Sequence, residues 1–160
     1  MPSLRLFPGQ SFPAGLILLG VLGAWLALPG LGWGQTVSLQ AQVIYAANQP
    51  GGVDSRLGSL AGNLQKTFRY SMYQLLDAPK GSATLNQTWR TGLPDNRSLE
   101  ITPTAIQGGQ YSLTVRVLGA GGQASLSTVV RLRHAATVLV GGPSHQQGVL
   151  IIAIGVRSDR

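Results

Sequence analysis

The chain has 160 residues, a formal net charge of +7 and no cysteine, which excludes a disulfide framework, a thiolate nucleophile and a cysteine-based metal site. It has only five acidic residues, and its arginines are dispersed along the chain rather than gathered in a run. We therefore interpret the charge as a thinly charged surface with few acids, ahead of a dedicated site for nucleic acid or another anion.

The N-terminal part has the pattern of a secretory signal. A short segment with one basic residue, Arg5, precedes an apolar run at residues 15–31, and Gly32-Trp33-Gly34 supplies small residues where a signal peptidase cleaves. We predict a signal peptide over residues 1–34 and a secreted or periplasmic protein. A retained membrane anchor is the alternative, but the run is short for about 30 Å of hydrocarbon and Pro29 breaks its end. An exported chain without disulfides favours a bacterial source.

Residues 35–156 are long enough for one domain with a two-layer core, and residues 157–160 read as a C-terminal tail. Apolar and polar residues alternate over residues 37–45, which predicts a half-buried strand. Asp54 then offers an N-cap. The apolar residues after it follow helical spacing: Leu57, Leu60, Ala61, Leu64 and Phe68. We predict one N-terminal amphipathic helix packed on a sheet, with a partner or membrane surface as the alternative for its apolar stripe.

The rest of the chain has the composition of short strands separated by glycine and proline. We predict strands over residues 69–76, 83–90, 98–102, 110–118, 125–133, 137–140 and 149–156. This spacing is typical of an antiparallel β-sandwich or a partly open barrel, so the predicted class is mainly β. Ile151, Ile152 and Ile154 break the alternation, which indicates a strand that is central or lies between a sheet and a covering helix.

The loop at residues 141–148 contains the one adjacent serine and histidine, Ser144 and His145. A hydrolase elbow has the pattern Gly-x-Ser-x-Gly between a strand and a helix, whereas Pro143 precedes this serine and a strand follows the loop. We therefore favour a turn, with residues 143–147 as an exposed connection between paired strands and His145 without a carboxylate partner. A small hydrolase built on Ser144 and His145 remains the least favoured alternative.

No other pattern predicts chemistry. The two histidines, His134 and His145, are too few for a zinc site, and the glycine pairs lack the context of a phosphate-binding loop. Asp54 reads as a cap and Asp95 as a turn residue, which leaves few carboxylates for acid–base catalysis. The aromatic stretch at residues 68–73 favours core packing over a ligand platform. We expect no catalytic, cofactor or metal-binding residues and no cofactor.

Part of the chain resembles the β-domain of the bacterial secretins. The resemblance lies in Leu99-Glu100-Ile101-Thr102-Pro103, in the strand at residues 108–115, in Thr128-Val129-Val130 and in a strand at residues 137–142 that ends in Gly-Gly. It covers about residues 99–154, and it implies a small cell-envelope protein with a related β-layer. Pro143 departs from the family pattern, and the chain lacks the long gate segment and repeated periplasmic domains, so a channel is not implied.

These observations predict a secreted or periplasmic domain that is not an enzyme and acts by binding or assembly, with a protein of the cell envelope as a possible partner. The first alternative is an accessory component of an envelope secretion or pilus assembly. We expect contact with a membrane only through an uncleaved signal segment, and no specific nucleic acid.

Overall fold

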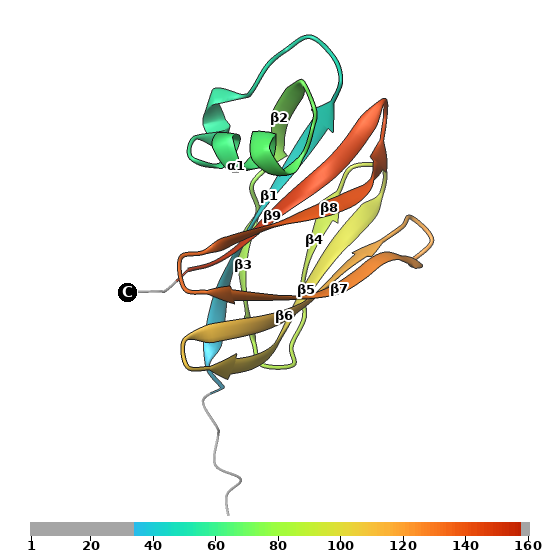
Figure 1. Ribbon diagram of the computed structural model, residues 1–160. Helices are drawn as coiled ribbons and strands as arrows, with labels where there is room; N and C mark the ends of the chain where they lie inside the picture. Colours follow the sequence, from blue (N-terminus) through green and yellow to red (C-terminus); the bar gives the residue numbers. More distant parts are fainter. Residues whose placement is uncertain (1–33, 158–160) are drawn as a thin grey trace, which may run out of the picture. The chain divides into compact units, whose positions relative to one another are not determined.

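The computed structural model describes residues 34–157, so the predicted signal peptide lies outside the described residues except for its last residue. Within that range the chain forms nine strands in two antiparallel sheets (Figure 1). Sheet A has the order β2-β1-β9-β8, with β3 also paired to β1, and sheet B has the order β4-β5-β6-β7. Sheet A contains β1 (Thr36–Ala47), β2 (Met72–Asp77), β3 (Lys80–Thr84), β8 (Thr137–His145) and β9 (Gly148–Arg157). Sheet B contains β4 (Trp89–Leu93), β5 (Arg97–Gln107), β6 (Gln110–Leu118) and β7 (Ala124–Arg133).

The two sheets pack face to face and do not close into a barrel, so the sandwich form of the prediction is the one observed. β3 pairs with the first half of β1 and β2 with its last residues, so both occupy the same edge of β1. The alternating apolar residues of both sheets meet in a first core that excludes water. Its fully buried members include Leu39, Val43, Leu99, Ile101, Leu113, Val115, Leu150, Ile152 and Ile154.

A second, smaller core lies on the other face of sheet A, under a 3₁₀ turn, η1 (Ser55–Leu57), and a short helix, α1 (Leu60–Thr67). The prediction of one N-terminal helix is wrong in position and length, because α1 follows β1 and has 8 residues. Gly58, with φ 51°, separates η1 from α1 and ends the continuous helix expected from Asp54. Within residues 34–157, no helix is long and apolar enough to cross a membrane.

Tyr73 on β2 fixes the end of α1. It is 1% exposed, and its hydroxyl lies 3.2 Å from the Leu64 carbonyl oxygen and 2.7 Å from that of Phe68. The Tyr70 backbone N–H also donates to this hydroxyl, over 3.2 Å. Phe68 and Tyr70 pack against the second core, so the aromatic stretch serves packing, as the sequence indicated.

β9 lies between β1 and β8, and it is buried on both faces along most of its length. Ile152 and Ile154 face sheet B, while Ile151 and Ala153 face the helix side. This confirms the prediction, from the unbroken apolar run, of a central strand between a sheet and a covering helix. Arg157 belongs to β9 and pairs with Ser38 rather than starting a tail.

The predicted strands at residues 83–90 and 98–102 have other boundaries in the structure. The strand expected over residues 83–90 is split by a turn in which Asn86 has φ 62°, a conformation that asparagine tolerates. The strand expected over residues 98–102 extends to Gln107, because a register shift between Pro103 and Ala105 lets β5 and β6 stay paired beyond the proline.

Asp54 caps η1 and binds three groups. Its carboxylate accepts from the Arg56 backbone N–H over 3.0 Å, from the Arg56 guanidinium over 2.6 Å, and from the Leu75 backbone N–H over 3.1 Å. The hydrogen bonds from the Arg56 side chain and then its backbone hold the pKa of the Asp54 carboxyl well below its usual range. The carboxylate therefore caps the turn, as the sequence predicted, and it also links η1 to β2.

Replacing Leu64, which is fully buried, with Ala should lower the free energy of unfolding by about 2–5 kcal/mol, because the cavity cannot refill. Leu60 is only half-buried, so Leu60→Ala should cost clearly less. Urea denaturation of both variants measures the difference, and equal losses would contradict the packing described for α1.

The Asp54 interactions should make stability depend on pH. Because its pKa is lower in the folded than in the unfolded chain, their contribution is complete above the unfolded value of about 4 and is lost as pH falls below it. Asp54→Asn keeps a capping oxygen but has no charge. The stability difference between wild type and this variant should therefore be largest at neutral pH and shrink at about pH 2, which urea denaturation at both pH values measures.

Candidate functional site

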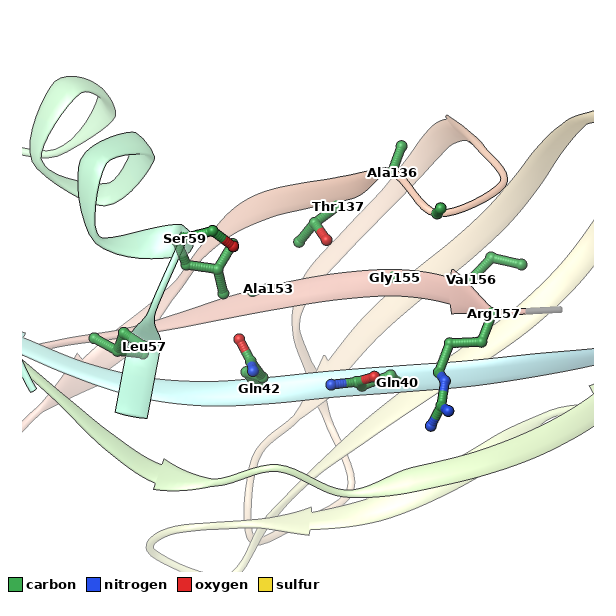
Figure 2. Close-up of a pocket in the computed structure, with 12 residues that line it drawn as sticks. Gln40, Gln42, Leu57, Ser59, Ala136, Thr137, Ala153, Gly155, Val156 and Arg157 are labelled. Carbon is green, nitrogen blue, oxygen red and sulfur yellow. The ribbon is translucent and has the colours of Figure 1, made fainter. Parts of the chain in front are cut away.

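The outer face of sheet A is only partly covered by η1 and α1. Beyond them lies an open pocket of about 230 Å³, which we call the sheet A trough. Figure 2 shows Gln40 and Gln42 on β1, with Thr137 beyond β9 and Ser59 at the start of the helix. The other lining residues are Leu57, Leu60, Ala135, Ala136, Ala153, Gly155, Val156 and Arg157.

The register of β1 with β9 explains why the trough is where it is. Along this face, side chains are apolar under the helix and become polar or small toward the start of β1 and the end of β9. The strand pairing therefore divides the face into a covered apolar half and an open polar half. The opposed pairs, from the covered to the open half, are Ile44 with Ile151, Gln42 with Ala153, Gln40 with Gly155 and Ser38 with Arg157.

Gly155 has no side chain, which leaves a hollow at the middle of the trough. It pairs with Gln40 on one side and Thr137 on the other, so the row has side chains at both ends and none at its centre. A Cβ atom at this position would lie 3.5 Å from both the Ala136 carbonyl oxygen and the Thr137 hydroxyl, which is ordinary contact. A larger side chain would thus fit the backbone and fill the hollow.

Gln42 supplies an acceptor without a partner. Its Oε1 atom is buried and has no hydrogen-bond partner within residues 34–157. A buried acceptor left unsatisfied costs about 1–3 kcal/mol, so turning the Gln42 amide outward to meet a donor in the trough would relieve that cost. Arg157 at the end of the trough adds a positive charge (Figure 2). The lining residues include no carboxylate and no histidine, so they suit recognition by hydrogen bonds better than acid–base chemistry.

His145 is not where the sequence placed it. We expected an exposed histidine without a carboxylate partner, but His145 is 7% exposed, and its Nδ1 lies 2.7 Å from Asp95 Oδ2. Its ring packs edge to face with that of Tyr45, with ring centroids 5.5 Å apart. The expected loop is also shorter, because β8 runs through to His145 and only Gln146 and Gln147 lie between the strands. The paired strands themselves are confirmed, with Val138 opposite Ile154 and Val140 opposite Ile152.

The error in the loop has a physical cause. Gly141 and Gly142 favour a turn in the sequence, yet both lie in β8 at a register shift, and neither has a positive φ. The turn uses Gln146, with φ 50°, instead. Gly148 then begins β9 where a Cβ atom would collide with the Ala46 carbonyl oxygen, so glycine is required by close approach of β1.

The histidine and its carboxylate do not form a nucleophilic triad with Ser144. A triad needs the serine hydroxyl hydrogen-bonded to the histidine. Ser144 is exposed while His145 is buried, because neighbouring residues of a strand face opposite sides. No hydrogen bond of residues 34–157 joins the two side chains, and the Ser144 carbonyl oxygen instead accepts from Arg97 over 2.8 Å.

The same contacts close one end of the sandwich. Asp95 lies in the turn between β4 and β5, and Arg97 is the first residue of β5 in sheet B; they bind His145 and the Ser144 carbonyl at the end of β8 in sheet A. Asp95 has φ 63°, a conformation that suits its predicted place in a turn. We call this set of contacts the Asp95–His145 clasp. It joins the two sheets where their strands end.

The remaining candidate residues are not brought together. His134 follows β7 and His145 ends β8, so the two histidines lie at opposite ends of that strand. Glu100 is paired with Arg90 and Arg116, and Asp77 caps its own turn by accepting from the Ala78 N–H. In the described part of the chain, no three acidic or histidine side chains gather where a metal ion could bind.

Sequence reasoning missed Gln40 and Gln42 because polar residues on alternate positions of a strand read as a solvated face. The signal that distinguishes them is the change from glutamine to Ile44 and Ala46 on the same face, which marks where a covering element begins.

The chain matches no protein-family model, no curated protein and no solved structure.

Replacing His145 with Ala should lower the free energy of unfolding by about 1–3 kcal/mol, because it removes a buried ring and its bond to Asp95. Ser144→Ala, next to it but exposed, should change it by less than about 0.5 kcal/mol. Thermal or urea denaturation measures both. A His145→Ala protein as stable as wild type would show that the clasp does not hold the sheets together.

Proposed function

We propose that this chain is a non-enzymatic binding domain that acts outside the cytoplasm and holds its ligand in the sheet A trough. The observation that carries the proposal is the open hollow at Gly155 beside the buried, unpartnered Oε1 atom of Gln42. Export rests on the signal pattern at residues 1–34 alone.

The contacts of the acidic side chains support binding over catalysis. Asp54 and Glu100 are held in ion pairs with arginines, and Asp95 lies 2.7 Å from the His145 ring in the clasp. The hydrogen bonds from Arg56 hold the pKa of the Asp54 carboxyl well below its usual range, which makes that group a poor general base. The trough, by contrast, presents amide and hydroxyl groups together with small apolar side chains, a combination common in binding pockets.

The size of the trough limits its ligand. A volume of about 230 Å³ lies below the range of roughly 300–1,000 Å³ that drug-sized ligands occupy. We infer a small polar group, such as one sugar ring or a few residues of an extended peptide. It would present an N–H or O–H donor to Gln42, and Arg157 would favour a nearby negative charge.

The alternative function, as an accessory component of an envelope secretion or pilus assembly, rests on the resemblance to the secretin β-domain.

The test fills the trough without disturbing the core. Gly155→Val places a side chain in the hollow, and it should leave stability unchanged or raise it by up to about 1 kcal/mol, since glycine weakens a strand. Gly92→Val is the matched control, because Gly92 also lies in a strand and a Cβ atom there meets nothing within 4 Å.

Ligand-observed NMR with a panel of monosaccharides and short peptides measures binding to the three proteins. We expect at least one compound to bind wild type and Gly92→Val but not Gly155→Val. Binding that survives in Gly155→Val would place the site elsewhere, and a panel without any ligand would contradict the proposed ligand class.

A further inference from the structure

Four arginines that are scattered in the sequence meet on the outer face of sheet B. Arg90 lies on β4, Arg116 on β6, and Arg131 and Arg133 on β7. Their neighbours along the strands, such as Val115, Val117, Val130 and Leu132, are buried toward the first core. Because side chains alternate between the two faces of a strand, all four guanidinium groups stand on the solvent side. We call this surface the sheet B face.

The sheet B face has an excess of positive charge. Glu100 is its one acidic residue, since Asp95, the other acid of residues 89–133, lies in the turn of the clasp. Glu100 is 8% exposed and is held between Arg90 and Arg116, the latter at 3.3 Å. Arg131 and Arg133 are exposed and form no ion pair within residues 34–157. Four positive charges thus face one negative charge that is already neutralised.

The spacing of these charges fits an extended polymer better than a single small anion. Arg90, Glu100 and Arg116 form one row across three strands, and that row reaches Ser127 on β7. Arg131 lies four residues farther along β7, which is about 13 Å in a strand. Arg131 and Arg133, about 7 Å apart on the same face, can share one anionic group, but only a ligand with repeated acidic groups can also contact the row that holds Arg116.

The residues between the arginines indicate the chemistry of that polymer. Thr114 and Ser112 share the face and offer hydroxyl groups to a hydroxylated ligand, and the Thr102 hydroxyl beside them is bonded to that of Thr88. The two aromatic residues of sheet B, Trp89 and Tyr111, pack against the first core, so the face has no ring on which a nucleic-acid base could stack. Val129 is its one large exposed apolar side chain, which leaves little to insert into a bilayer.

From this surface we infer that the sheet B face binds a linear acidic polysaccharide. The inference does not depend on the trough, because the two surfaces lie on opposite sheets and share no residue. Its specificity would come from matching the spacing of the arginines, and binding should weaken as salt screens them.

The test compares two variants that each remove two positive charges. The double variant Arg131→Gln with Arg133→Gln removes the positive charges at one end of the sheet B face. The double variant Lys66→Gln with Arg69→Gln removes exposed charges in α1 and just after it, on the side of sheet A. Binding of the domain to immobilised heparin and to immobilised polygalacturonate is measured at several salt concentrations. We expect about fivefold to tenfold weaker binding for the first pair and less than twofold for the second.

A further variant tests whether the double arginine variant binds less tightly only because its structure is disturbed. Val129→Glu changes a residue that is 58% exposed and places a carboxylate among the arginines, so it should weaken binding with an unchanged circular dichroism spectrum. Equal losses in both charge-removing pairs would show an effect of net charge alone and overturn the inference. So would the absence of binding to either polysaccharide, or tighter binding to anionic vesicles or single-stranded DNA with the same dependence on Arg131 and Arg133.

Discussion

The pairing of β1 with β9 is the contact on which the rest of the structure depends. These two central strands carry apolar residues toward sheet B along their whole length, and toward α1 along one half. A slip of β1 by one residue would turn Gln40 and Gln42 into the first core and expose Leu39 and Ala41, so the contrast between the two faces fixes the register. The pairing therefore sets the position of both cores and of everything attached to them.

The trough follows from the point at which this double burial ends. The helix side of β1 changes from Ile44 and Ala46 to Gln42 and Gln40, and α1 is too short to reach over the glutamines. Extending α1 by even one turn would add cover but would need apolar partners that this half of the face lacks. The polar residues of β1 and the short length of α1 thus mark the same boundary between the covered and the open half of this face.

Each paired acidic side chain joins separate parts of the structure. Asp54 links η1 to β2, the Asp95–His145 clasp joins the ends of the two sheets, and Glu100 spaces two arginines in one row. With so few acids in the chain, this pairing leaves arginines on β7 without partners. The sheet B face therefore has four arginines and one glutamate, while other exposed basic residues of the described chain, such as Lys66, Lys80 and Arg157, lie elsewhere.

The sequence by itself determined the class of fold, since the period of two in residues 110–118 and 125–133 and the double-sided apolar run at residues 151–154 depend only on local pattern. The N-cap at Asp54 was equally visible, because capping is a contact between near neighbours. The interruption at Gly58 was not, since glycine is tolerated within a helix as well as between two.

Only the tertiary structure decided which distant residues meet. His145 and Asp95 are 50 positions apart, and nothing local distinguishes a histidine that will be buried from one in an exposed turn. The four arginines of the sheet B face look dispersed because strand order and register, not sequence distance, place them on one side. Both outcomes depend on how the sheets pack, and that packing is a sum of many apolar contacts that no single segment encodes.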